Sequence, residues 1–248
     1  MNKINPFWSW NDRLRKEELV RQIELMKESG IEGFFMHARG GLKTEYMGED
    51  WFDCIKACMD KADELGMEAW AYDENGWPSG FASGAVPKKG VDFQQKRLET
   101  AILNKGDRLP ENLLGLYRVS ENGFESINAA ENGCFAVYYI ANPYYIDTFN
   151  PAVIKSFIAE THEKYYERFG DRFGKSLKGF FTDEPQYGNG ATPWSTLFPE
   201  LFLKEYGYSV TDNLPFLYFD FDGAEKFRSD FYSMAAKQFR TSFIKQMY

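Results

Sequence analysis

Two apolar runs of this sequence end in pairs of neighbouring carboxylates. The first run leads into Asp73 and Glu74, and the second leads into Asp183 and Glu184. Burying a charge is costly unless the charge is paired or used, whereas a strand end that opens into a cleft can hold a carboxylate partly desolvated. The two pairs therefore predict acid–base chemistry on a polar, ring-shaped substrate.

Glycoside hydrolysis is the reaction that best fits such pairs, because it needs one protonated and one ionised carboxylate beside the bond that breaks. Glu184 is the leading candidate for the general acid. Side chains alternate along a strand, so Asp183 and Glu184 are expected to point to opposite sides. Pro185 favours an extended backbone at Glu184, which would fix the direction of a proton donor; the alternative is a structural ion pair with Arg39. The candidate catalytic residues are Glu184, Asp183 and Glu74.

Polar and aromatic side chains at the other predicted strand ends are candidates for substrate binding. Asn11 and Asp147 have an alternative role as helix caps, and His37 has one as a core histidine. Asp73 could instead organise the turn that follows it, whereas Trp77 in that turn is typical of a stacking platform for a sugar ring. The candidate substrate-binding residues are Asp73, Trp77, His37, Arg39, Trp8, Trp10, Asn11 and Asp147.

An alternation of strands and helices is expected to position these residues. A β-α-β series with short connections implies parallel strands, whose carboxyl ends lie at one edge of a sheet. The predicted strands are residues 6–10, 33–37, 70–72, 144–148 and 179–182, and the predicted helices are residues 19–30, 51–65, 150–165 and 224–248.

Two segments interrupt this alternation. Residues 87–141 predict a β-rich insertion after the third strand, and residues 186–222 predict a long loop. The expected fold class is α/β, an incomplete (β/α)8 TIM-barrel type with about five β/α units, forming a single glycosidase-like domain over residues 1–248. The alternative is an open doubly wound sheet of unrelated function, which would hold the two carboxylate pairs far apart. The first strand is not followed by the G-x-G-x-x-G motif common in such sheets.

The amino-acid composition limits the classes of molecule that this protein is expected to bind. A net charge of −8 over 248 residues argues against nucleic acid, and an aromatic content of 18% suits carbohydrate recognition. The three cysteines have neither zinc-site nor disulfide spacing. The sequence has no membrane-length apolar run and no signal-peptide pattern at its start, so we expect a cytoplasmic protein with no membrane partner. Neither metal ligands nor the oligomeric state can be predicted.

Four motifs together resemble the catalytic barrel of glycoside hydrolase family 106, the α-L-rhamnosidase type. They are residues 6–11 (PFWSWN), 37–41 (HARGG), 72–80 (YDENGWPSG) and 181–185 (FTDEP). The resemblance covers most of residues 6–185 except the insertion. It implies a (β/α)8 barrel, an inverting mechanism with two carboxylates, and calcium in the active site. Family members continue beyond the fifth strand, so the resemblance identifies this chain as the N-terminal part of such a barrel.

The sequence thus predicts a glycoside hydrolase that acts on α-L-rhamnosides or related glycosides by carboxylate acid–base catalysis. The alternative is a carbohydrate-binding barrel remnant without catalysis. Trp77 would then bind sugar, but no glycoside would be hydrolysed.

Overall fold

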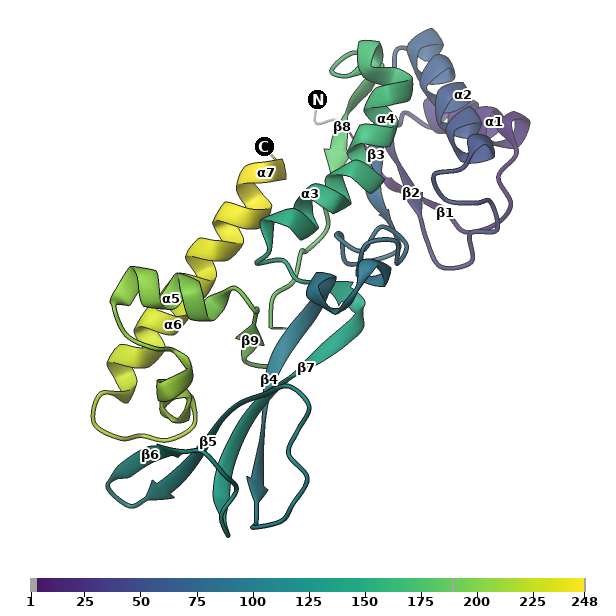
Figure 1. Ribbon diagram of the computed structural model, residues 1–248. Coiled ribbons are helices and arrows are strands. Elements are labelled where there is room, and N and C mark those ends of the chain that lie inside the picture. Colours follow the sequence, from purple (N-terminus) through teal and green to yellow (C-terminus); the bar gives the residue numbers. More distant parts are fainter. Residues whose placement is uncertain (1–3, 189, 248) are drawn as a thin grey trace. The chain divides into compact units, whose positions relative to one another are not determined.

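The computed structural model describes residues 4–188 and 190–247, and the chain divides into two compact units (Figure 1). The first unit comprises Met1–Val86 and Lys155–Pro185, and the second comprises Pro87–Ile154 and Gln186–Tyr248. The α/β class is confirmed, because both units combine a sheet with helices. That residues 1–248 form one domain stays a prediction.

The first unit contains a four-stranded parallel sheet. Its strand order is β1-β2-β3-β8, so β3 and β8 are neighbours although a long stretch of sequence separates them. These strands confirm four of the five predicted for the barrel. They are β1 (Phe7–Trp10), β2 (Gly33–Ala38), β3 (Glu68–Asn75) and β8 (Leu177–Phe181).

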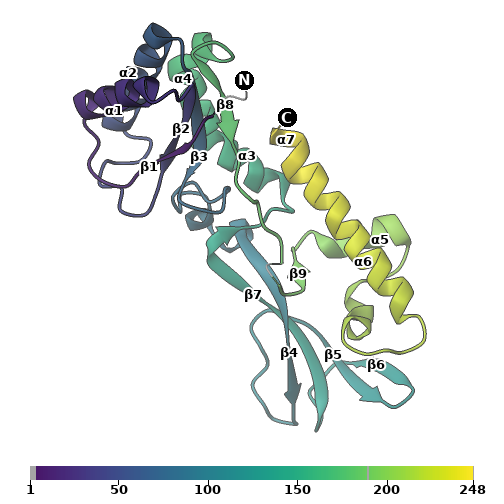
Figure 2. The same ribbon diagram turned by 180° about the vertical axis from the view of Figure 1, so that it is seen from behind.

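Three helices cover one face of this sheet, which we call the helix face (Figures 1 and 2). They are α1 (Lys16–Glu28), α2 (Glu49–Leu65) and α4 (His162–Phe169). Phe34 and Met36 of β2 point to this face and are fully buried with Trp51 of α2, as strand alternation requires. Gly66 ends α2 in the left-handed conformation, at φ 64°, which is common at helix C-termini.

The second unit contains a five-stranded antiparallel sheet with the order β6-β5-β7-β4-β9. Helices α5 (Phe198–Tyr206) and α6 (Ala224–Phe239) pack on it, and Trp194, Phe198 and Phe231 are buried in the core between them. The strands are β4 (Gln94–Leu103), β5 (Leu113–Ser120), β6 (Gly123–Ile127), β7 (Cys134–Ile146) and β9 (Pro193–Trp194).

The strand predicted at residues 144–148 is not part of the parallel sheet, and this prediction was wrong. Its first residues are the end of β7, where Ile146 pairs with Gln94 of β4. The register shifts beside this pair, and such an irregularity accommodates Pro143, which has no N–H to donate. The described residues therefore contain four parallel strands of the expected barrel, and these do not close into a barrel.

Two further predictions need correction. The segment predicted as a loop over residues 186–222 contains β9, α5 and a 3₁₀ helix at Thr211–Leu217. The helix predicted over residues 150–165 is interrupted at Thr161, between α3 (Pro151–Glu160) and α4. Asn150 caps the start of α3, because the Ala152 N–H donates to its Oδ1 at 3.0 Å. No helix in the described part of the chain is long and apolar enough to cross a membrane.

Candidate active site

The face of the parallel sheet opposite the helices carries a group of aromatic rings, which we call the aromatic face. Phe7 of β1 packs against Phe35 of β2 and Phe181 of β8, with ring centroids 5.2 and 4.8 Å away. Towards the carboxyl ends of the strands, His37 stacks on Tyr72 at 3.6 Å with an interplanar angle of 21°. Parallel pairing with alternating side chains brings these residues to one face.

Asp183 is joined to this face by a hydrogen bond from Tyr72. The buried Tyr72 hydroxyl donates to Oδ2 of Asp183 at 2.5 Å. Burial, together with this bond, raises the pKa of Tyr72, so the phenol stays protonated and remains a donor. Asp183 itself is half-buried. One carboxylate oxygen is thus fixed, and the group lies beside the rings of Tyr72 and His37.

His37 is neutral at ordinary pH. Its ring is 4% exposed, and burial, followed by the nearby charge of Arg39, lowers its pKa to about 4. Neither ring nitrogen has a hydrogen-bond partner among the described residues. His37 is buried as a core histidine would be, and an interaction with the Gly76 backbone opposes the lowering of its pKa, so the alternative of a core histidine stays a prediction.

Glu184 follows Asp183 and is exposed. Strand β8 ends at Phe181, so the alternation expected for Asp183 and Glu184 does not apply to them. The predicted extended backbone at Glu184 is also wrong: its φ is +40°, in the left-handed region that residues with a Cβ rarely adopt. Among the described residues, Arg39 forms no ion pair with Glu184. The structural ion pair considered as the alternative role of Glu184 is therefore not formed.

Asp73 lies on the helix face and links three segments. Its Oδ1 accepts a hydrogen bond from Ser79 Oγ at 2.5 Å, and its Oδ2 accepts one from Thr182 Oγ1 at 2.6 Å. His162 Nε2 of α4 lies 3.5 Å from the same Oδ2. Ser79 Oγ in turn accepts the Asp183 N–H at 2.8 Å. Asp73 therefore positions Asp183 through Ser79, and the two carboxylate pairs lie side by side rather than far apart.

Glu74 is fully buried and organises the loop after β3. Its two oxygens accept four backbone N–H groups, at distances of 2.6 to 3.2 Å. The donors are Asn75, Gly80, Ala82 and Ser83. Burial raises the pKa of Glu74 to about 7, although these N–H groups oppose the shift. The structure thus places Glu74 inside the loop and not with Asp183 on the aromatic face.

Trp77, at the turn of the same loop, is 49% exposed. This agrees with the surface position expected for a stacking platform, and sugar stacking stays a prediction. Arg39 is exposed just after β2.

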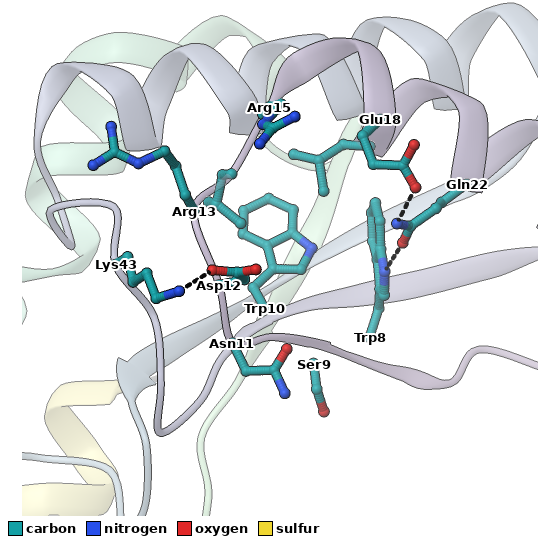
Figure 3. A pocket seen from close by; sticks show the side chains of 12 residues that line it. Trp8, Ser9, Trp10, Asn11, Asp12, Arg13, Arg15, Glu18, Gln22 and Lys43 are labelled. Carbon is teal, nitrogen blue, oxygen red and sulfur yellow. Dashed lines mark hydrogen bonds and ion pairs between the residues drawn. The ribbon is translucent and has the colours of Figure 1, made fainter.

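A separate cavity of about 570 Å³ lies beside the end of β1 (Figure 3). It collects three of the predicted substrate-binding residues, Trp8, Trp10 and Asn11. Trp10 is 2% exposed and packs against Trp51, so it belongs mainly to the core of the helix face. Asn11 is exposed and does not cap α1, which begins after Arg15 without a side-chain capping bond.

Asp147 belongs to the second unit, because the strand that was to place it at the barrel edge is part of β7. Its Oδ2 accepts a hydrogen bond from Ser195 Oγ at 2.7 Å and lies 3.8 Å from Lys96 Nζ. Burial raises the pKa of Asp147 to about 6 and lowers that of Lys96. Its Oδ1 accepts the Phe149 N–H at 3.0 Å, which resembles the capping alternative predicted for it.

The calcium expected from the family resemblance stays a prediction. Within residues 4–188 and 190–247, no group of three or more histidine, cysteine or acidic side chains is placed to hold a metal ion. The oxygens of Asp73 and Glu74 are already engaged by protein donors. We therefore assign no step to a metal.

Several residues important to this site were not predicted. Tyr72 was noticed only as part of a strand, yet it holds Asp183. Ser79, Thr182 and His162 were not singled out, although all three contact Asp73. The alternation of side chains along each strand shows which residues share a face within that strand. It does not show that His37 and Tyr72 are in contact, because this depends on the register between β2 and β3.

Comparison with solved structures shows a related fold. The chain is similar to a rhamnosidase from Novosphingobium sp. PP1Y, with a TM-score of 0.63 and 12% sequence identity. The match covers 97% of this chain and 44% of the rhamnosidase, so the chain spans less than half of that protein's length. No protein-family model matches the chain, and no curated protein matches it in sequence. The likeness concerns the fold.

Proposed function

We propose that this chain carries part of the active site of a glycoside hydrolase acting on α-L-rhamnosides or related glycosides. The observation that carries the proposal is the placement of Asp183 and Glu184 together after one strand of a parallel sheet. Asp183 is fixed by Tyr72, and Glu184 is exposed. The fold likeness to a rhamnosidase supports the same class of reaction.

In this proposal, Glu184 donates a proton to the glycosidic oxygen as the bond breaks. Its exposed position leaves it accessible to substrate, and its left-handed backbone sets the direction of the side chain. Asp183 keeps one oxygen, Oδ1, for a proton from water or from a sugar hydroxyl, since Tyr72 holds Oδ2. His37 and Tyr72 form the wall beside these carboxylates, and Arg39 and Trp77 bind other parts of the sugar.

The test compares two substrates that differ in their need for acid catalysis. An alkyl α-L-rhamnoside has a poor leaving group that needs a proton, whereas 4-nitrophenyl α-L-rhamnoside has a good one. We expect Glu184→Gln to lower turnover of the alkyl substrate by about 100-fold or more and that of the nitrophenyl substrate much less. Glu163→Gln, a change at an exposed glutamate on α4, is the matched control. Equal rates for wild type and Glu184→Gln on the alkyl substrate would remove Glu184 from the role of acid.

A second candidate function is carbohydrate binding without hydrolysis. The exposure of Trp77 favours it, because a ring that is 49% exposed in a loop held by Glu74 provides a fixed stacking surface. This candidate predicts that L-rhamnose binds without turnover and that Trp77→Ala abolishes binding. Tyr166→Ala, at a ring that is 63% exposed on α4, should leave binding unchanged.

A further inference from the structure

The cavity beside β1 is lined by three cationic side chains, although the protein as a whole carries a net charge of −8. They are Arg13, Arg15 and Lys43 (Figure 3). Lys43 forms an ion pair with Asp12 at 2.7 Å. Arg13 and Arg15 are exposed and form no ion pair with a described residue. Two guanidinium groups therefore remain available to a ligand in this cavity.

The acidic residues of the cavity are already neutralised. Lys43 compensates Asp12, and Glu18 accepts two hydrogen bonds from Arg21, at 2.6 and 2.8 Å. The bonds from Arg21 lower the pKa of Glu18 to about 2, so this group is a paired carboxylate at ordinary pH. The excess charge of the cavity is therefore positive.

Neutral donors face the same cavity. Helix α1 begins here, and Arg15 at its N-cap makes no side-chain hydrogen bond to the first turn. A helix start of this kind presents backbone N–H groups and the positive end of the helix dipole to an anion. Trp10 is 2% exposed, and its Nε1 has no hydrogen-bond partner among the described residues. In Figure 3 this nitrogen lies on the ring edge turned toward Trp8 and Glu18, two other lining residues.

The combination of donors defines the ligand. Guanidinium groups bind planar carboxylates through paired hydrogen bonds, and a volume of about 570 Å³ lies within the usual range of small-molecule sites. The half-buried ring of Trp8 is fixed by its bond to Gln22 at 2.9 Å and lines the cavity with a surface for a sugar ring. We propose that this cavity binds the carboxylate of an acidic sugar, a uronate. The choice of a sugar rests on the proposed function.

The test uses a charged ligand and its neutral isostere. Binding of sodium glucuronate and of glucuronamide to the whole chain is followed by the ¹H–¹⁵N signal of the Trp10 indole and by calorimetry. We expect glucuronate to bind and shift the Trp10 signal, and glucuronamide to bind at least about 10-fold more weakly. The double variant Arg13→Gln/Arg15→Gln should lower glucuronate affinity about 10-fold or more, whereas Arg108→Gln, an exposed arginine of the second unit, should not.

Three results would overturn this inference. Equal affinities for glucuronamide and glucuronate would show that the ligand's negative charge does not contribute to binding. An unchanged glucuronate affinity in the double variant would show that Arg13 and Arg15 do not bind the ligand. Inorganic sulfate binding as tightly as glucuronate would overturn the assignment to a sugar. These readouts do not depend on hydrolysis, so the anion site can fail while rhamnoside turnover succeeds, and the reverse.

Discussion

The Tyr72 hydroxyl donates a hydrogen bond of 2.5 Å to Oδ2 of Asp183, a residue 111 positions further along the chain. The bond forms because β3 and β8 are paired in parallel, with Tyr72 opposite Phe181. On the other side, Asp73 holds Ser79, and Ser79 accepts the Asp183 N–H. Asp183 is thus fixed through both its side chain and its backbone, which is the preorganisation that acid–base chemistry needs.

Replacing Tyr72 by Phe should weaken this preorganisation without changing the size of the ring. A hydrogen bond to a charged group contributes about 1.5–3 kcal/mol, so we expect hydrolysis of an α-L-rhamnoside to slow about 10-fold or more in kcat, with a smaller change in KM. Tyr166→Phe, at an exposed tyrosine, is the control. Wild-type kcat in Tyr72→Phe would show that the bond to Asp183 is structural only.

His37 makes the stability of the first unit depend on pH. Its pKa is lowered to about 4 in the folded chain from 6.5 in the unfolded chain, so the unfolded chain binds more protons between these values. The free energy of unfolding should therefore rise between pH 4 and pH 6.5, by on the order of 3 kcal/mol from this group. The contribution is fully present above pH 6.5 and is lost as the pH falls to 4.

The matched variant is His37→Phe, which keeps a ring against Tyr72 but does not titrate. The chain has two histidines, so His162 is the one that this variant keeps. Urea unfolding at several pH values should show a shallower rise from pH 4 to pH 6.5 in His37→Phe. Parallel profiles for the two proteins would contradict the buried, neutral state of His37.

The sequence was sufficient to predict the elements that depend on local pattern. The apolar run in residues 33–37 and the helical spacing in residues 51–65 are strong, and both segments form the predicted elements. The prediction for residues 144–148 failed because an apolar stretch after a proline reads as a new strand. Only pairing with Gln94 shows that β7 continues through Pro143.

The helix α5 was missed although its signals were present. Pro199 stands in the first turn, and Gly207 ends the helix in the left-handed conformation at φ 79°.

The candidate site was predicted more by residue type than by position. The acids Asp73, Glu74 and Asp183 were identified, but which oxygens are free depends on contacts with Ser79, backbone N–H groups and Tyr72, and no local pattern encodes those.

Glu74 should matter for stability more than for chemistry. Glutamine has one acceptor oxygen, so Glu74→Gln leaves its amide nitrogen facing backbone N–H donors that the carboxylate satisfied. We expect the free energy of unfolding to fall by about 2–3 kcal/mol, measured by urea at pH 8, where the wild-type carboxylate is ionised. Glu163→Gln should change it little. A stability equal to wild type would show that the loop after β3 does not depend on Glu74.

The backbone of Glu184 provides a test that separates strain from catalysis. At φ +40° a residue with a Cβ is strained by about 1–2 kcal/mol, whereas glycine is not. Glu184→Gly should therefore be about 1 kcal/mol more stable than Glu184→Ala, although glycine ordinarily destabilises relative to alanine. Urea unfolding of the two variants measures this difference.

Both variants lack the carboxylate, so both should lose the hydrolysis of an alkyl α-L-rhamnoside to the same extent. If Glu184→Ala is the more stable of the two, the left-handed backbone is not held in solution. If the two variants differ in their remaining activity, the backbone itself contributes to the reaction. If both variants lose activity equally and Glu184→Gly is the more stable, the strained backbone costs stability and the carboxylate alone carries the activity. That combination is expected for a functional residue.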